Sequence, residues 1–198
     1  MDKADHPKIQ DLRQKAILTA AFDVFRQYGF RRATMEDIAQ AAGMSRAALY
    51  LHYRNKQDIF QSLVQVYFDT TYAEIARILA RTLPVTETLS AAFAAQGGPI
   101  MQALLSSPHG AEFIDAKTLV NAEIVKTAEV RLTGVYAAWL DREAAAGRVT
   151  LDGFGSSAAC AATMLAALTG MKTWAADYAG YVAAVARLAA LFGRALGR

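Results

Sequence analysis

The stretch TMEDIAQAAGMSRAALYLHYRNK, which runs from Thr34 to Lys56, is the most informative part of this chain. It contains two short helical patterns separated by a turn at Gly43. Thr34, followed three residues later by Asp37, is typical of a helix N-cap with an acidic partner at the third helical position. Two short helices joined by a tight, glycine-containing turn are typical of a helix-turn-helix, so the stretch predicts that motif.

Further capping residues mark where the neighbouring helices begin. Ser45 is suited to cap the second helix of the motif. Asn55 followed by Asp58 repeats the first capping device at the start of a longer helix. In a helix-turn-helix the second helix lies in the major groove of DNA, and its N-terminal residues meet the edges of the bases. We therefore expect this segment to bind double-stranded DNA.

The distribution of charge supports this expectation. The chain has 198 residues and a formal net charge of +3. Residues 1–58 hold ten Lys or Arg and seven Asp or Glu, whereas residues 59–198 hold eleven of each, so all of the net charge lies on the segment with the motif. A local excess of basic side chains suits contacts with phosphates. The alternative is a basic surface that is merely solvated.

The composition favours a cytoplasmic protein. Cys160 is the only cysteine, which excludes an intramolecular disulfide and suits a reducing compartment. The N-terminus MDKADHPKIQ is polar and has no apolar signal region. The longest charge-free run, residues 153–171, is rich in Gly, Ser, Ala and Thr, so we interpret it as a helix buried against protein rather than a membrane span. We expect no membrane partner.

The spacing of Gly and Pro predicts an all-α fold, with few strand signals anywhere. We expect an N-terminal three-helix head that contains the helix-turn-helix, joined by a long helix to a helical remainder. Beyond the motif, the expected helices cover about residues 11–28, 56–83, 86–95, 111–146, 156–176 and 181–196. An interruption is expected at Gly97-Gly98-Pro99, and a bend in the 111–146 helix is placed either near Thr118 to Asn121 or at Gly134.

The last two expected helices are nearly free of charge, because residues 153–198 contain a single acid, Asp177. Such helices need a partner surface. We expect them to pack against the same pair from a second copy, as a four-helix dimer interface. The alternative is that both are buried within one monomer.

The run AAFDVFRQYGFRRATMEDIAQAAGMSRAALYLHYRNKQDIF resembles the DNA-binding head of TetR-type transcriptional regulators. The family-like positions are Phe25, Gly29-Phe30, Thr34, Asp37-Ile38-Ala39, Ala42-Gly43, Ser45, Leu49-Tyr50 and Asn55-Lys56. The resemblance covers residues 12–62, under a third of the chain, and it implies a homodimer with a helical C-terminal domain that holds a small molecule. We accordingly divide the chain into a DNA-binding domain (1–55) and an effector-binding and dimerisation domain (56–198). The resemblance implies a repressor that is released by its ligand.

Seven residues are predicted to contact DNA: Thr34, Ser45, Arg46, Ala47, Tyr50, His52 and Lys56. Arg46 and Ala47 lie just inside the recognition helix, where Arg can pair with guanine O6 and N7 and Ala can touch a thymine methyl. The others resemble phosphate-contacting positions of the family or, for Ser45, combine a phosphate contact with the cap. Tyr50 as a core residue and His52 as a surface residue without a contact remain alternatives.

Aromatic and Met side chains of the C-terminal part are predicted to line an effector cavity. These are Tyr67, Tyr72, Phe93, Met101, Phe113, Trp139, Met164 and Trp174. Such a mixture suits a small apolar or aromatic molecule, although each of these residues also has an interpretation as ordinary core. Nothing in the sequence identifies the ligand.

The sequence supports other classes of function less well. The three histidines are scattered without metal-ligand spacing, and Cys160 has no charged neighbour in the sequence to activate it. No nucleophile elbow, phosphate loop or dinucleotide motif is present. We expect no enzyme activity, catalytic residue, metal or cofactor. An architectural DNA binder is disfavoured by the small charge of the head, while an activator, or a regulator that answers to a protein partner, stays open. The prediction is a ligand-responsive, sequence-specific repressor that binds a palindromic operator as a homodimer.

Overall fold

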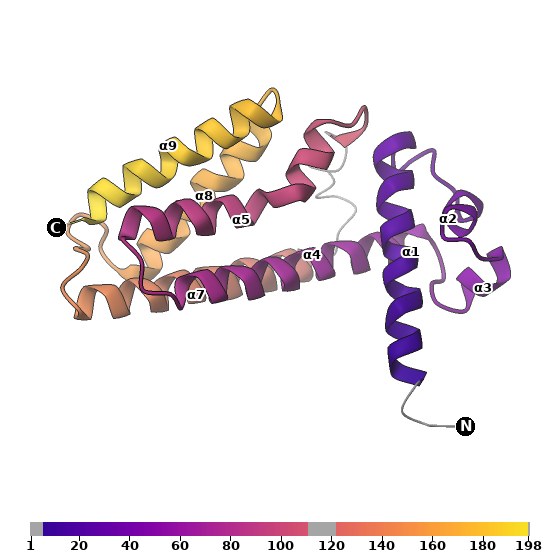
Figure 1. Ribbon diagram of the computed structural model, residues 1–198, viewed down its shortest axis with the longest axis horizontal. Helices are drawn as coiled ribbons and strands as arrows, with labels where there is room; N and C mark the ends of the chain where they lie inside the picture. The colour runs from indigo at the N-terminus through magenta and orange to yellow at the C-terminus, as the bar shows by residue number, and fades with distance from the viewer. Residues whose placement is uncertain (1–5, 111–121, 198) are drawn as a thin grey trace. The chain divides into compact units, whose positions relative to one another are not determined.

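The structure is a computed structural model that describes residues 6–110 and 122–197 (Figure 1). Within these residues all regular structure is helical apart from one isolated bridge between Val149 and Gly197. The helices are α1 (His6–Tyr28), α2 (Met35–Ala41), α3 (Arg46–Tyr50), α4 (Lys56–Leu79), α5 (Val85–Leu105), α7 (Ala122–Ala145), α8 (Ser157–Trp174) and α9 (Tyr178–Leu196). The predicted all-α class is confirmed.

The chain forms two compact units. Unit 1 comprises Met1–Val66 and Ser107–Asn121, and unit 2 comprises Tyr67–Ser106 and Ala122–Arg198. The helix α4 begins in unit 1 and ends in unit 2. The predicted division into domains at residue 55 stays a prediction.

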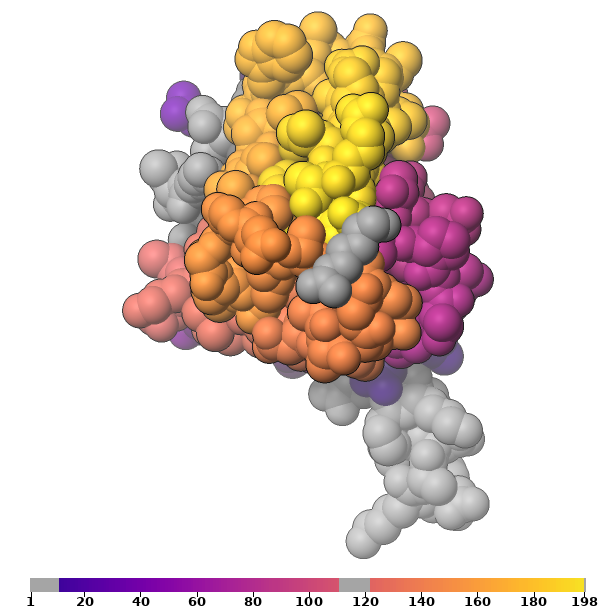
Figure 2. All heavy atoms as spheres, turned by 90° about the vertical axis from the view of Figure 1, so that its left-hand side faces the viewer, coloured from indigo at the N-terminus to yellow at the C-terminus, as the bar shows by residue number. Residues whose placement is uncertain are grey.

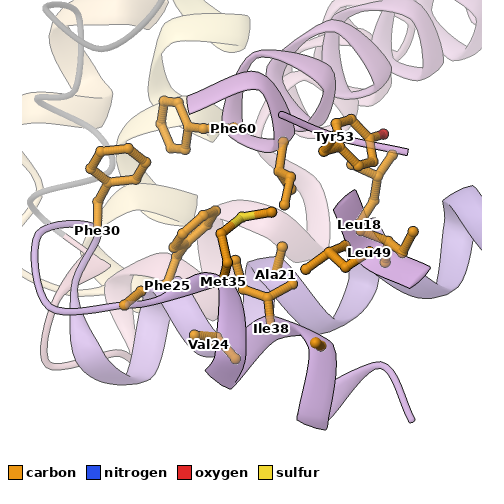
Figure 3. Close-up of a cluster of buried hydrophobic side chains, with 14 residues drawn as sticks. Leu18, Ala21, Val24, Phe25, Phe30, Met35, Ile38, Leu49, Tyr53 and Phe60 are labelled. Atoms are coloured by element: carbon orange, nitrogen blue, oxygen red, sulfur yellow. The ribbon is translucent and has the colours of Figure 1, made fainter. Parts of the chain in front are cut away.

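Unit 1 has a core built from its first four helices, and Figure 3 shows the side chains that fill it. The rings of Phe25, Phe30 and Phe60 meet with centroids 5.2 to 6.0 Å apart. Leu49 of α3 is fully buried and Tyr53 nearly so. Burying such side chains contributes about 1.5–3 kcal/mol each, which holds the short α2 and α3 in place.

The predicted caps are present. Thr34 and Asp37 form a capping box in which the Asp37 amide donates to the Thr34 hydroxyl and the Thr34 amide donates to the Asp37 carboxylate. The Ala48 amide donates to Ser45 Oγ at 3.1 Å, which caps α3. The Asp58 amide likewise donates to Asn55 Oδ1 at 2.9 Å.

The start of α1 differs from the expected one, whereas the end of α1 and the interruption of α5 lie where they were expected. α1 begins at His6 rather than near residue 11, because the polar segment before residue 11 continues the helix. Its end at Tyr28 is as expected, with Gly29 at φ 80°. In α5 the expected interruption lies at Gly98, whose φ of 49° and ψ of −154° break the helix.

In unit 2, α5 packs on α9 and α7 packs on α8. α7 continues through Gly134 without a break, so the bend considered there is absent, and the alternative position near Thr118 to Asn121 lies outside the described residues. Figure 2 shows the end of this unit where the loop before α8 meets the end of α9. There the Thr150 amide donates to the Leu196 carbonyl at 2.8 Å.

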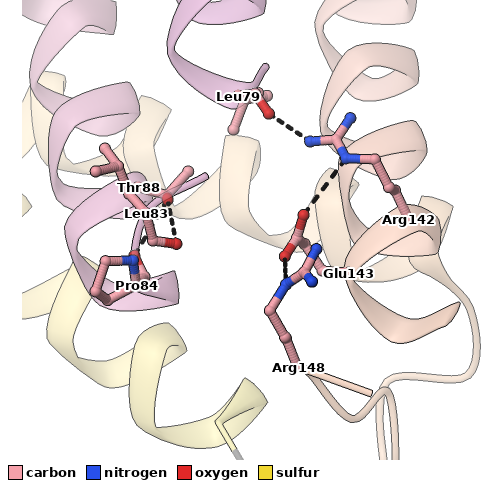
Figure 4. Close-up of polar contacts among 7 residues, drawn as sticks. All are labelled: Leu79, Leu83, Pro84, Thr88, Arg142, Glu143 and Arg148. Atoms are coloured by element: carbon pink, nitrogen blue, oxygen red, sulfur yellow. Dashed lines mark hydrogen bonds and ion pairs between the residues drawn. The ribbon is translucent and has the colours of Figure 1, made fainter. Parts of the chain in front are cut away.

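A buried carboxylate holds the end of α7 (Figure 4). Glu143 is 6% exposed and pairs with Arg148 at 2.5 Å and with Arg142 at 3.4 Å. Arg142 also donates to the Leu79 carbonyl at the end of α4. The pKa of Glu143 is lowered, first by the hydrogen bond from Arg148. Glu143 therefore joins α7 to the loop that follows it.

Among the described helices, α9 alone is long and apolar enough to cross a membrane, a test that the core helix of a globular protein also passes. Tyr181, Val185, Leu188 and Phe192 recur at helical spacing along α9 and are buried. Because these side chains face the rest of unit 2, we interpret α9 as a core helix. The charge-free run noted in the sequence lies mainly in α8, which does not pass the same test.

Candidate DNA-binding site

The geometry of α2, the turn and α3 is set by the backbone and by one buried side chain. Gly43 has φ 67°, a conformation that glycine adopts without strain. The Gly43 amide donates to the Gln40 carbonyl and the Met44 amide to the Ala39 carbonyl, at 3.1 and 3.0 Å. Leu49, with no exposed surface, anchors the inner side of α3. The opposite side of α3 is therefore presented to solvent in a defined orientation.

Five of the seven predicted contact residues are exposed on unit 1: Thr34, Ser45, Arg46, Ala47 and Tyr50. Arg46 and Tyr50 are one helical turn apart, and Arg46 Nη2 donates to the Tyr50 hydroxyl at 3.4 Å. The guanidinium lies 5.5 Å from the centre of the Tyr50 ring. Tyr50 is 43% exposed, so the alternative that it belongs to the core is wrong.

The capping contacts also determine the charge at the start of α2. The Thr34 hydroxyl donates to Asp37 Oδ2 at 2.7 Å, and this bond is the first cause of the lowered pKa of the Asp37 carboxyl. On α3, the hydrogen bond with Tyr50 raises the pKa of Arg46. Both groups are therefore charged near neutral pH. A phosphate that approached the start of α2 would meet a carboxylate there as well as backbone amides.

Lys56 is placed differently from the other candidates. Its ammonium donates to the carbonyls of Phe30, Arg31 and Ala33, at 2.8, 2.9 and 2.8 Å. It also lies 5.0 Å from the centre of the Phe30 ring. A lysine ammonium has three donors, and all three are used here. The phosphate contact of Lys56 stays a prediction, but it requires at least one of these bonds to break. His52, four residues before Lys56, is half-buried, and its DNA contact stays a prediction.

Two exposed residues close to α3 were not singled out from the sequence. Leu51, at the C-terminal end of α3, is 86% exposed, which is unusual for a leucine. The Arg54 side chain is 88% exposed and pairs with Asp58 at 2.8 Å. The positive charge of Arg54 was a usable signal, whereas nothing in the local pattern distinguishes Leu51 from a core residue.

The predicted effector residues divide by burial. Phe93, Met101, Trp139 and Met164 are buried in unit 2, and Tyr67 and Tyr72 are half-buried there. Trp174 is 81% exposed, so it lines no cavity in this structure, and the prediction for it is corrected. Its position at the last residue of α8 turns its side chain toward solvent. Phe113 lies outside the described residues.

The described parts of the chain offer no metal site and no activated thiol. Residues 11–110 and 122–197 contain no cluster of His, Cys, Asp or Glu that could hold a metal ion. Cys160 is buried, and its burial raises the pKa of the thiol to about 11. A thiol with such a pKa is protonated at neutral pH and is a poor nucleophile.

Comparison with known proteins places the helix-turn-helix in a family. Residues 17–63 match the model of the bacterial regulatory proteins of the tetR family. Over 51 residues, 26% of this chain and 24% of the relative, the sequence is 45% identical to the transcriptional repressor BepR of Brucella suis. Over 83 residues, 42% of this chain and 38% of the relative, it is 31% identical to the transcriptional activator FasR of Mycolicibacterium smegmatis.

The alignments span only 23% to 43% of the lengths of the first curated relatives. The likeness of fold extends further. The structure of SmeT, the repressor of a multidrug efflux pump of Stenotrophomonas maltophilia, superposes with a TM-score of 0.70 at 18% identity and covers 93% of this chain and 90% of that one. All three of these proteins are named as regulators of transcription, two as repressors and one as an activator.

Proposed function

We propose that this chain, whose residues 17–63 match the model of the tetR family of bacterial regulatory proteins, is a cytoplasmic transcriptional repressor of that family. We propose further that it reads a palindromic operator as a homodimer and is released by a small molecule. The observation that carries the proposal is the exposed face of α3, where Arg46, Ala47 and Tyr50 stand on a helix anchored by the buried Leu49. A fixed helix with an exposed Arg near its start suits readout of the major groove.

We assign contacts with the DNA bases and contacts with the DNA phosphates to different residues of this face. Arg46 is exposed and charged, and its contact with Tyr50 orients the guanidinium along the helix. A bidentate contact of Arg with guanine discriminates against other bases by about 1–3 kcal/mol. Thr34, Ser45 and Tyr50 lie exposed around it and are assigned to phosphates. Ala47 is assigned to a thymine methyl.

The dimer is proposed to form through α8 and α9. Both helices carry an exposed face of small and apolar side chains, which in α9 includes Val182 at 47% and Leu191 at 56% exposure. The small exposed residues of these two faces are Ala159, Ala162, Ala166, Ala183 and Ala186. Small side chains allow two pairs of helices to approach closely as a four-helix interface. A dimer is also what an inverted repeat in the operator requires.

Release by a ligand is proposed to act through α4, a single helix of 24 residues that begins beside α3 in the sequence and ends in unit 2. The two recognition helices of a dimer must lie about 34–36 Å apart, or a multiple of that distance, to read one face of DNA. A ligand that binds one tilt of α4 more tightly shifts the dimer toward that form, by no more than the difference in affinity. The effector is proposed to be small and apolar or aromatic.

The proposal is tested by selecting bound duplexes from a random pool with the full chain, at two salt concentrations. We expect an enriched inverted repeat whose half-sites are one or more helical turns apart. If no sequence is enriched and binding only weakens as salt rises, the protein is a nonspecific binder and the roles of Arg46 and Ala47 are refuted. Placing the selected operator upstream of or over a promoter then distinguishes activation, the activity of FasR, from repression.

A further inference from the structure

Four helices of unit 2 bring polar side chains together beside the break in α5. Tyr67 comes from α4, Gln96 from α5, Lys172 from the last turn of α8 and Tyr181 from α9. The Tyr67 hydroxyl donates to the backbone carbonyl of Gln96 at 2.5 Å. Lys172 Nζ donates to the same hydroxyl at 3.2 Å and to the same carbonyl at 3.3 Å. These four residues are called the polar cluster.

Two atoms of the polar cluster are buried without a hydrogen-bond partner in the described structure: Gln96 Oε1 and the Tyr181 hydroxyl. Gln96 is 5% exposed and Tyr181 is 2% exposed. A buried polar group without a partner destabilises the fold, so such groups are rare where they serve packing alone. Burial raises the pKa of Tyr181, and the nearby Tyr67 adds to the rise, which keeps the hydroxyl protonated and able to donate.

The cation of the polar cluster is held by neutral groups. Lys172 is half-buried, and in the described parts of the chain it makes no ion pair. Two of its three donors are directed to the Tyr67 hydroxyl and the Gln96 carbonyl, which leaves one. A partly buried cation gains most from an anion, because charge-assisted hydrogen bonds are roughly twice as strong as neutral ones.

The backbone of α5 packs closely against the Tyr181 hydroxyl at Gly97 and is open at the next residue, Gly98. A Cβ added at Gly97 would lie 2.2 Å from the Tyr181 hydroxyl, so only glycine allows that hydroxyl to approach α5 here. A Cβ added at Gly98 would meet no atom within 4 Å. The break at Gly98 therefore adjoins open space, on the same stretch of α5 that carries the Gln96 carbonyl. Phe93, one turn earlier in α5, is fully buried and supplies apolar surroundings.

We propose that the polar cluster binds the carboxylate of a small apolar acid, with Lys172 as its counterion and the Tyr181 hydroxyl as a second donor. A carboxylate has two oxygens, and the free donor of Lys172 and the Tyr181 hydroxyl supply one hydrogen bond to each. Gln96 Oε1 accepts from a donor on the ligand near the acid group. The inference rests on the proposed function only in taking unit 2 as the effector-binding part, and it names the chemical class of the effector.

The test is calorimetric titration of the 198-residue chain at neutral pH with 2-hydroxyoctanoate and 3-phenyllactate, whose hydroxyl groups can donate to Gln96 Oε1, each beside its matched amide. We expect the acids to bind and the amides to bind at least tenfold more weakly. Lys172→Met removes the charge but keeps the apolar stem, and it is expected to weaken binding of the acid about 10- to 100-fold. Lys126→Met, at an exposed lysine of α7, is the matched control and is expected to change nothing.

Tyr181→Phe separates binding from folding. Removing an unpartnered buried hydroxyl is expected to leave the melting temperature of the free protein unchanged or higher, while the acid binds more weakly. The inference is overturned if acids and amides bind alike, if Lys172→Met binds the acid as well as the unchanged protein does, or if neither acid binds up to its solubility limit. Each of these three results is independent of DNA binding, because the titrations contain no DNA.

Operator release is measured separately, by fluorescence anisotropy of a labelled selected duplex. Binding of the acids through Lys172 without release supports the polar cluster as a ligand site and refutes the ligand-controlled part of the proposed function. A protein that selects an operator but binds neither acid refutes the polar cluster while the DNA-binding function stands.

Discussion

Replacing Lys56 by methionine removes three hydrogen bonds from one ammonium group, and the result distinguishes two roles for this residue. Lys56 donates to the carbonyls of Phe30, Arg31 and Ala33, which belong to the segment between α1 and α2. Lys56 itself is the first residue of α4. The ammonium thus joins the start of α4 to the segment that leads into the helix-turn-helix.

The expected loss follows from these contacts. A net hydrogen bond contributes about 0.5–1.5 kcal/mol, and three together would contribute about 3 kcal/mol if fully buried. Because Lys56 is half-buried, solvation of the group reduces this, and we expect a loss of about 1–2 kcal/mol in the free energy of unfolding. Affinity for DNA should fall for all sequences alike, since the placement of α2 is loosened, while the dependence of affinity on salt stays the same.

Both quantities are measurable on one variant. Urea denaturation followed by circular dichroism reports the stability of Lys56→Met, and titrations of a selected duplex at several salt concentrations report the slope. Lys15→Met, at an exposed lysine of α1, is the control. Unchanged stability with a salt slope lower by about 0.9 would refute the internal role and establish Lys56 as a phosphate ligand, as the sequence had predicted.

Three further predictions concern other contacts. Arg46→Ala should relax base preference at one position of each half-site, at a cost of about 1–3 kcal/mol for the preferred base, as read from competition with single-base variants. Glu143→Gln should lower the free energy of unfolding at neutral pH. The hydrogen bond from Arg148 lowers the pKa of the Glu143 carboxyl, so the carboxylate stabilises the fold fully above its ordinary pKa of about 4.5. Denaturation at a series of pH values should show this stabilisation disappearing as pH falls through the lowered pKa. Gly97→Ala should destabilise by about 1–3 kcal/mol in thermal melts, because the added Cβ meets the Tyr181 hydroxyl.

Each of these has a matched comparison. Uniform weakening of every duplex by Arg46→Ala would show that the guanidinium contacts phosphate. Glu74→Gln, at an exposed glutamate paired with Arg77, should leave the pH profile nearly unchanged, and an equal effect would refute the role of burial at Glu143. Gly134→Ala, at an uncrowded position inside α7, should be neutral or stabilising, and a loss equal to that of Gly97→Ala would exclude the steric explanation.

The features of unit 1 that could be inferred from the chain are those made between neighbours in sequence. The Thr34–Asp37 box and the Ser45 cap each join residues three positions apart, and the turn at Gly43 depends on that residue's own φ. Such contacts exist wherever a helix begins, whatever surrounds it. Leu49 lies opposite the exposed face of α3 and is fully buried.

Interactions between distant residues were not accessible in this way. Lys56 reaches carbonyls 23 to 26 residues earlier, and no local pattern distinguishes this from a solvent-exposed lysine. Trp174 was predicted to line the cavity because it is a large aromatic residue of the C-terminal part, but as the last residue of α8 it lies on the surface. Lys172 is an isolated charge in an apolar helix, and its partners Tyr67 and Gln96 come from α4 and α5, so no local pattern indicates its contacts.

The helical class, the motif and the exposed face of α3 therefore follow from the amino-acid sequence, because capping, turn formation and helical periodicity act over one or two turns of chain. The internal bonds of Lys56 and the polar cluster around Lys172 were settled only by tertiary packing. Packing brings together side chains up to 105 residues apart, and it determines which charges face solvent and which are left to bind a partner.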